Sequence, residues 1–239
     1  MATNNSISLF LPCYNEGETI EAVVKRSSAV LSALTEDFEI IIIDDGSSDR
    51  TRGVIERVRL AMREVKVVRH SRNRGYGAAI RSGITASSKE IVCFMDSDGQ
   101  FDVAEIEILL GALARYDIVA GYRVRRQDPL YRRVNAYLFN RLVRRLFGLT
   151  VADVDCGMKV FKRGVFEIVK PKANGAFINA EIVIRAKAAG FAITEVGVNH
   201  FARRCGEQTG AKLHVIVCAF KELFGLYREL RALRRIGVT

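Results

Sequence analysis

Short apolar runs alternate with longer stretches of helical periodicity through the first half of the chain. Three runs are almost continuously apolar, as is typical of strands buried on both faces, at residues 7–11, 39–43 and 91–95. Apolar residues recur at helical spacing in the stretches 18–34, 51–63, 75–86 and 103–113. With further short strands at 65–68 and 118–120, this alternation predicts an α/β fold with a mostly parallel, doubly wound sheet.

The second half has a less regular pattern. It predicts strands at 159–161 and 193–198 and helices at 130–147, 181–189 and 214–235. The last helix is amphipathic, with an apolar stripe formed by Val215, Ile216, Ala219, Leu223, Leu226, Leu230 and Leu233. Glycines near 205–211 suggest a boundary, which divides the chain into a domain at 1–210 and a C-terminal amphipathic helical segment at 211–239.

Acidic and polar residues follow each of the three apolar runs. Asp96 and Asp98 come directly after the run that ends at Met95, and Asp44 follows the run that ends at Ile43. The first run leads into Pro12-Cys13-Tyr14-Asn15-Glu16. Because parallel strands present their carboxyl ends at one edge of a sheet, these residues are expected to share one site. Hard carboxylate oxygens suit Mg²⁺ or Mn²⁺, and such a cation would hold a diphosphate.

Composition and charge narrow the class of protein. Five cysteines without a CxxC pair indicate neither a disulfide framework nor a zinc site. The net charge of +10 is concentrated between residues 121 and 145, where eight arginines face one acid, and in the C-terminal segment. Such clusters suit phosphates, an anionic membrane or nucleic acid. No nucleic-acid-binding module is recognisable, so nucleic acid is not an expected partner.

Other motifs exclude common alternatives. Gly75-Tyr76-Gly77 lacks the third glycine of a dinucleotide fingerprint, since Ile80 occupies that position. No P-loop is present, and the three histidines have no metal-ligand spacing. No apolar stretch reaches the roughly 18 residues that a membrane crossing needs, and no signal peptide is visible. The protein is therefore expected to be cytoplasmic.

Taken together, these motifs resemble family 2 glycosyltransferases, and in particular the dolichol-phosphate mannose synthase-like, polyprenyl-phosphate branch. The resemblance covers about residues 6–210. It is carried by 12–16, 44–51, Gly75-Tyr76-Gly77, Asp96-Ser97-Asp98-Gly99-Gln100, Gly121-Tyr122-Arg123, 153–159 and 203–208. It implies a GT-A fold, a Rossmann-like and mostly parallel sheet flanked by helices, and inverting transfer of a hexose from a nucleotide sugar.

The resemblance also assigns roles to individual residues. The metal and the diphosphate would be held by Asp96, Asp98 and Gln100. The acceptor phosphate would be bound by Arg123 and Arg132, which with Asp98 are the candidate catalytic residues. The GDP- or UDP-linked sugar donor would be contacted by Pro12, Tyr14, Glu16, Asp44, Asp96, Ser97, Gln100 and Arg203.

The chemistry leaves the acceptor open. A polyprenyl phosphate is already an anionic nucleophile and needs no general base, whereas a soluble or saccharide hydroxyl would need one. Asp153 and Glu181 are the candidates for that base, and Glu181 has a structural alternative. A non-catalytic subunit that binds a sugar nucleotide is a further reading. Two departures bear on the assignments, since Ala136 stands where the branch commonly has serine and Thr209 where some members have lysine.

The arginine-rich segment can be read in two ways. Arg132, Ala136, Asn140 and Arg144 recur at intervals of four, which predicts one stripe of a helix, either a solvated basic face or a surface for phosphate or lipid headgroups. We expect the enzyme to act peripherally at the inner face of the membrane. The C-terminal helix is expected to lie in the membrane interface, with packing on the sheet, on another subunit or on a membrane partner protein as alternatives.

Overall fold

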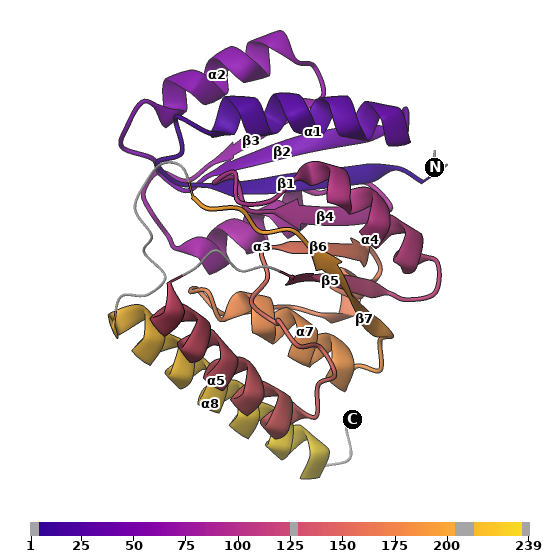
Figure 1. Ribbon diagram of the computed structural model, residues 1–239, viewed down its shortest axis with the longest axis vertical. Helices are drawn as coiled ribbons and strands as arrows, with labels where there is room; N and C mark the ends of the chain where they lie inside the picture. Colours follow the sequence, from indigo (N-terminus) through magenta and orange to yellow (C-terminus); the bar gives the residue numbers. More distant parts are fainter. Residues whose placement is uncertain (1–4, 125–128, 204–212, 236–239) are drawn as a thin grey trace.

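A seven-stranded sheet forms the centre of the molecule (Figure 1). The computed structural model describes residues 5–124, 129–203 and 213–235. The strand order is β3-β2-β1-β4-β6-β5-β7. The strands are β1 (Ile7–Cys13), β2 (Phe38–Asp44), β3 (Val65–Arg69), β4 (Ile91–Met95), β5 (Ile118–Arg123), β6 (Met158–Lys162) and β7 (Ile193–Val198). The predicted strands are therefore confirmed, each to within a few residues.

One strand runs against the others. β6 pairs antiparallel with both β4 and β5, whereas the remaining pairs are parallel. The sheet is thus mostly parallel, and the reversal occurs in the second half, where the sequence pattern is irregular. The reversed strand brings residues 153–157, which precede β6, to the edge where β4 ends.

Helices cover both faces of the sheet, as a doubly wound fold requires. In β1, Ile7, Leu9 and Leu11 pack on one face while Phe10 packs on the other. The first face is covered by α1 (Ile20–Leu34), α2 (Thr51–Ala61), the short η1 (Val103–Glu105) and α4 (Ile106–Leu113). The second face is covered by α3 (Tyr76–Ala86), α5 (Leu130–Phe147), α6 (Val165–Ile168), α7 (Ile178–Ala188) and α8 (Leu213–Arg235).

The two longest helices lie side by side at one end of the molecule (Figure 1). The rings of Phe139 in α5 and Phe220 in α8 are 5.9 Å apart, as are those of Phe147 and Tyr227. Because both pairs advance in the same direction along the chain, α5 and α8 run parallel.

The apolar stripe of α8 is used within the protein. Leu223, Leu226 and Leu230 are buried in the core that also holds α7 and the sheet. The expectation that this stripe meets a membrane is corrected, because these side chains already lose their water by packing on the core. The predicted boundary near 205–211 lies outside the described residues. None of the helices in the described ranges combines the length and apolarity that a membrane crossing needs.

Candidate active site

The loops after β1 and β4 are tied together at one edge of the sheet. The buried Ser97 hydroxyl donates to the carbonyl oxygen of Pro12 at 2.6 Å, and Thr19 Oγ1 donates to the carbonyl oxygen of Ser97 at 3.0 Å. These bonds bring the segment 12–16 against Asp96-Ser97-Asp98. The convergence of strand ends that the sequence predicted is therefore present.

Asp96 is tightly packed and hydrogen-bonded. Its backbone N–H donates to the carbonyl oxygen of Gly157, and the Tyr76 hydroxyl donates to Oδ1 at 2.7 Å. Burial raises the pKa of the Asp96 carboxyl to about 7, and the neighbouring Asp98 charge adds to the rise. A Cβ on Gly157 would lie 1.9 Å from Asp96 Oδ2, so any larger residue at this position would displace the Asp96 carboxylate.

Arg203 neutralises the other carboxylates of the site. Its guanidinium pairs with Glu16 and also reaches Asp98 Oδ2 at 3.4 Å. Burial raises the pKa of Glu16, while Arg203 opposes the rise and Asp98 adds to it. Repulsion among these acids is what a divalent cation relieves, so the oxygen donors of Asp96 and Asp98 fit Mg²⁺ or Mn²⁺.

Gln100 has a different contact from the one expected. Its Nε2 donates to the carbonyl oxygen of Phe201 at 3.0 Å, and the Phe201 N–H donates back to the carbonyl oxygen of Gln100. Gln100 thus fastens the loop after β4 to the segment that carries Arg203. Within the described part of the chain, no three His, Cys, Asp or Glu residues are placed to hold a metal ion. The carboxylate pair would need oxygens from the donor or from water, and Gln100 as a ligand stays a prediction.

Asp44 lies at the end of β2, where a nucleoside was expected. Its Oδ1 accepts the N–H of Ser47 at 2.9 Å, and its Oδ2 accepts from Arg69 Nε at 3.1 Å. Arg69, at the end of β3, was missed from the sequence, although its register opposite Asp44 follows from parallel pairing. Tyr14 is exposed beside this edge, so its ring is available to a ligand.

A buried polar network sets the start of α3. Asp45 accepts the backbone N–H groups of Arg74 and Gly75, both at 2.9 Å, and its Oδ1 is 2.5 Å from His70 Nδ1. The other ring nitrogen of His70 is 2.9 Å from Ser82 Oγ in α3. The network fixes the helix whose first residue, Tyr76, holds Asp96. The Gly75-Tyr76-Gly77 motif supports the family resemblance, but the sequence did not predict that Tyr76 contacts the acid pair.

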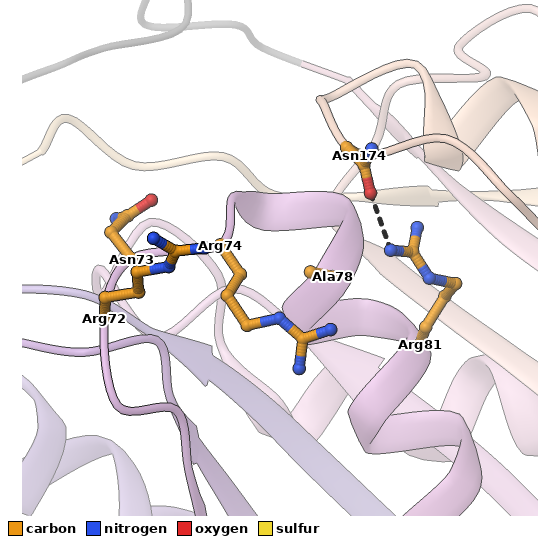
Figure 2. A pocket seen from close by; sticks show the side chains of 6 residues that line it. All are labelled: Arg72, Asn73, Arg74, Ala78, Arg81 and Asn174. Atoms are coloured by element: carbon orange, nitrogen blue, oxygen red, sulfur yellow. Dashed lines mark hydrogen bonds between the residues drawn. The ribbon is translucent and has the colours of Figure 1, made fainter.

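A basic pocket of about 430 Å³ flanks the start of α3 (Figure 2). Within it, Arg81 donates to the side-chain oxygen of Asn174 at 2.7 Å. It is lined by Arg72, Asn73, Arg74, Ala78, Arg81 and Asn174. The loop between β3 and α3, which contains Arg72, packs closely on the turn after β2, since a Cβ on Gly46 would lie 2.4 Å from the carbonyl carbon of Arg72.

Arg123 and Asp153 form a buried ion pair. Arg123 Nε lies 2.7 Å from Asp153 Oδ2, and one terminal nitrogen lies 2.6 Å from Oδ1. Burial disfavours the charged guanidinium, but the hydrogen bonds to Asp153 raise the pKa of Arg123 above its usual range. Both carboxylate oxygens of Asp153 are engaged by the arginine, and its candidacy as the base for a hydroxyl acceptor stays a prediction. Arg123 as an acceptor ligand stays a prediction and depends on its remaining N–H groups.

The expected polar stripe of α5 faces inward. Asn140 is buried, donates to the carbonyl oxygen of Ala136 and accepts the N–H of Val154 at 2.9 Å. Arg132 and Arg144 are half-buried on the same side, so this stripe is not a solvated basic face. It anchors the segment 151–157 beside the acid pair. The role of Arg132 at an acceptor phosphate is untested by these contacts.

Glu181, the second candidate base, is structural. Its carboxylate accepts the N–H groups of Lys172 and Ala173 at 2.9 and 2.7 Å and Arg185 Nε at 2.7 Å. The alternative reading of this residue is therefore confirmed.

Lys159 is a buried cation beneath the site that sequence reasoning missed. It pairs in register with Phe94 in β4, and its ammonium donates to the carbonyl oxygen of Cys156. Burial lowers the pKa of Lys159, while Asp153, Asp155 and Asp96 oppose that effect. A lysine in a buried strand just after an acidic segment was the available signal.

Comparison with known sequences identifies the family. The profile of Glycosyl transferase family 2 matches residues 8–169, which include the acid pair and the strands that position it. The chain belongs to glycosyltransferase family 2. The predicted family and its GT-A type of α/β fold are thereby confirmed.

Curated relatives of this glycosyltransferase come from the expected branch. The undecaprenyl-phosphate 4-deoxy-4-formamido-L-arabinose transferase of Yersinia enterocolitica is 30% identical over 216 residues, 88% of this chain and 64% of that protein. The protein of the same name from Pseudomonas fluorescens is 32% identical over 219 residues, 90% of this chain and 62% of that protein. The chain thus spans less than two thirds of these relatives' length.

Solved structures support the fold. Glucosyl-3-phosphoglycerate synthase from Mycobacterium tuberculosis, in complex with Mn²⁺ and UDP-glucose, aligns with a TM-score of 0.71 at 24% identity, covering 92% of this chain and 79% of that one. The same enzyme with UDP aligns with a TM-score of 0.69 at 22% identity. At this identity the likeness establishes the fold alone.

Proposed function

We propose that this glycosyltransferase moves a hexose, of mannose or glucose type, from a nucleotide diphosphate sugar to a polyprenyl phosphate at the cytoplasmic face of a membrane. The observation that carries the proposal is the state of the carboxylates. Asp96 and Asp98 form an acid pair at the strand edge, whereas Asp153 and Glu181 are held by arginines and backbone N–H groups. An acceptor that is already an anion fits this arrangement, because it needs no proton removed.

The reaction follows from these positions. An oxygen of the acceptor phosphate forms a bond to the anomeric carbon, and the bond from that carbon to the diphosphate breaks, so the electron pair leaves with the nucleoside diphosphate. Asp96 and Asp98 would hold Mg²⁺ or Mn²⁺, which supplies positive charge to the departing diphosphate. Arg203, which lies beside Asp98 and Glu16, adds a second cation on the donor side.

The relatives support the acceptor class. Both are named as undecaprenyl-phosphate transferases. The nucleotide and the sugar are left open, because the residues expected to contact them lie at a sheet edge and in loops. A donor panel should therefore include GDP-mannose, UDP-glucose, UDP-N-acetylglucosamine and a donor of the formamido-arabinose for which the relatives are named.

The test uses a radiolabelled sugar nucleotide, Mn²⁺ and a polyprenyl phosphate in detergent. Label is expected in the organic phase with the unaltered protein, to be lost in Asp98→Asn, and to persist in Asp102→Asn. The control changes a carboxylate that caps η1, where asparagine serves equally well.

Two results would replace the proposal. Label transferred to a water-soluble acceptor while the organic phase stays empty would favour a hydroxyl acceptor. Donor binding without transfer to any acceptor, unchanged in Asp98→Asn, would favour a non-catalytic subunit.

A further inference from the structure

The outward face of α5 is unusually apolar. Its first three turns carry large side chains at positions that fall on one helical stripe, and these side chains are 46–72% exposed: Leu130, Tyr131, Val134, Tyr137 and Leu138. Single exposed apolar residues are common on protein surfaces, but a contiguous set of this size marks an interaction surface. The stripe lies on the side of α5 opposite Asn140 and Val143, which are buried.

The cations around this stripe define its partner. Arg133, Arg141 and Arg145 are exposed on α5, which contains no acidic residue. On α8, the exposed cations are Lys221, Arg228 and Arg231. The two acids of α8 are engaged elsewhere: Glu222 accepts the N–H of Asn174, and Glu229 pairs with Lys172 and Arg185. The outward faces of both helices, in the described residues, are therefore apolar and positive.

α8 continues the same chemistry beside α5. A groove of about 490 Å³ runs along it, lined by Val217, Phe220, Lys221, Phe224, Gly225 and Arg228. Phe220 also packs on Phe139 of α5, which places the groove next to that helix. The two helices lie side by side at one end of the molecule (Figure 1).

We propose that α5, with the adjoining groove of α8, docks this enzyme on an anionic lipid bilayer. The stripe from Leu130 to Leu138 enters the interface between headgroups and acyl chains, and the arginines and lysine contact lipid phosphates. A second copy of the chain fits less well, because two such faces would bring like charges together. This proposal deepens the proposed function. It rests on that function only in so far as a lipid acceptor explains why the enzyme would dock on a bilayer.

The site is oriented for this docking. α5 follows β5, and Arg123 at the end of β5 pairs with Asp153 beside the acid pair. The apolar turns are the first of α5, those nearest to the strand end in the chain. Docking by this end brings the acceptor side of the site to the bilayer surface.

The chain contains no tryptophan, which gives a probe without background. Tyr137→Trp is expected to show a blue-shifted, brighter emission with phosphatidylglycerol-containing vesicles and a much smaller change with phosphatidylcholine alone. Leu60→Trp is the control, since Leu60 is 76% exposed on α2, which covers the opposite face of the sheet. An equal response of both probes, or none from Tyr137→Trp, would overturn the proposal.

Vesicle sedimentation gives a second measurement. Leu138→Asp is expected to lower vesicle binding at least tenfold, and Ile108→Asp to leave it unchanged, since these residues are 57% and 56% exposed on different helices. Added salt should weaken binding by screening the cations. A dimer in solution that Leu138→Asp dissociates, with no vesicle binding, would instead assign the face to a second copy.

These measurements need neither donor nor acceptor, so they separate the two proposals. Vesicle binding without sugar transfer leaves the docking face standing and overturns the function. Transfer to a polyprenyl phosphate in detergent, with no vesicle binding, supports the proposed function and overturns the docking face.

Discussion

Metal binding by the acid pair should depend steeply on pH. Asp96 has a pKa of about 7 because it is buried next to Asp98, and a cation binds only its ionised form. Near pH 6 about one molecule in eleven has Asp96 ionised, against about ten in eleven near pH 8. The apparent Kd for Mn²⁺ should therefore be about tenfold lower at the higher pH, equivalent to about 1.4 kcal/mol.

Thermal unfolding measures this difference. With saturating Mn²⁺, the stabilisation near pH 8 should exceed that near pH 6 by roughly 3–5 °C. Without metal, the change of stability with pH has the opposite sign. Since the folded pKa of Asp96 lies above its unfolded value, the folded state holds an extra proton between about pH 4 and 7, and stability falls as pH rises through that window.

A matched pair of variants isolates the cause. Tyr76 donates a hydrogen bond to ionised Asp96, so Tyr76→Phe should raise the pKa of Asp96 further. The affinity for Mn²⁺ should then rise at a higher pH than in the unaltered protein. Tyr116→Phe removes a hydroxyl from another partly buried tyrosine and should leave the profile in place. Equal Mn²⁺ affinity near pH 6 and 8 in the unaltered protein would refute the reasoning.

Three further changes test the architecture. Arg123→Met should lower the free energy of unfolding by about 3–5 kcal/mol in denaturant titration, because its buried carboxylate partner loses its counter-charge; a loss below about 1 kcal/mol would show that water screens the pair. Gly157→Ala should abolish stabilisation by Mn²⁺, since its Cβ would displace a carboxylate of the acid pair, while Gly164→Ala, with open space around it, should retain it. Glu39→Gln should lower the free energy of unfolding by a few kcal/mol near pH 7, because Lys66, Ser8 and Ser88 hold the pKa of this carboxyl at about 2 despite its burial. The difference between variant and unaltered protein should disappear as the pH falls from about 4.5 to 2. A difference that persists in acid would contradict this account.

Much of the fold and part of the site could be predicted from sequence. The strand ends after Met95 and Ile43 predicted a shared edge because parallel strands place their carboxyl ends together, and Ser97 bonding to Pro12 confirms it. The reversal of β6 was not predicted, since a short strand in an irregular region carries no sign of its direction. The bond from Tyr76 to Asp96 joins residues twenty positions apart and depends on how α3 is seated.

The sequence by itself determined which segments form strands and helices, because side-chain periodicity acts within each element. It also determined that acids end the strands, since that is a matter of order along the chain. Tertiary structure decided which side of each helix meets the core. Leu223, Leu226 and Leu230 of α8 are buried while Leu138 of α5 is exposed, and both helices show amphipathic patterns. Burial depends on which partner removes an apolar surface from water, and that partner lies far away in sequence.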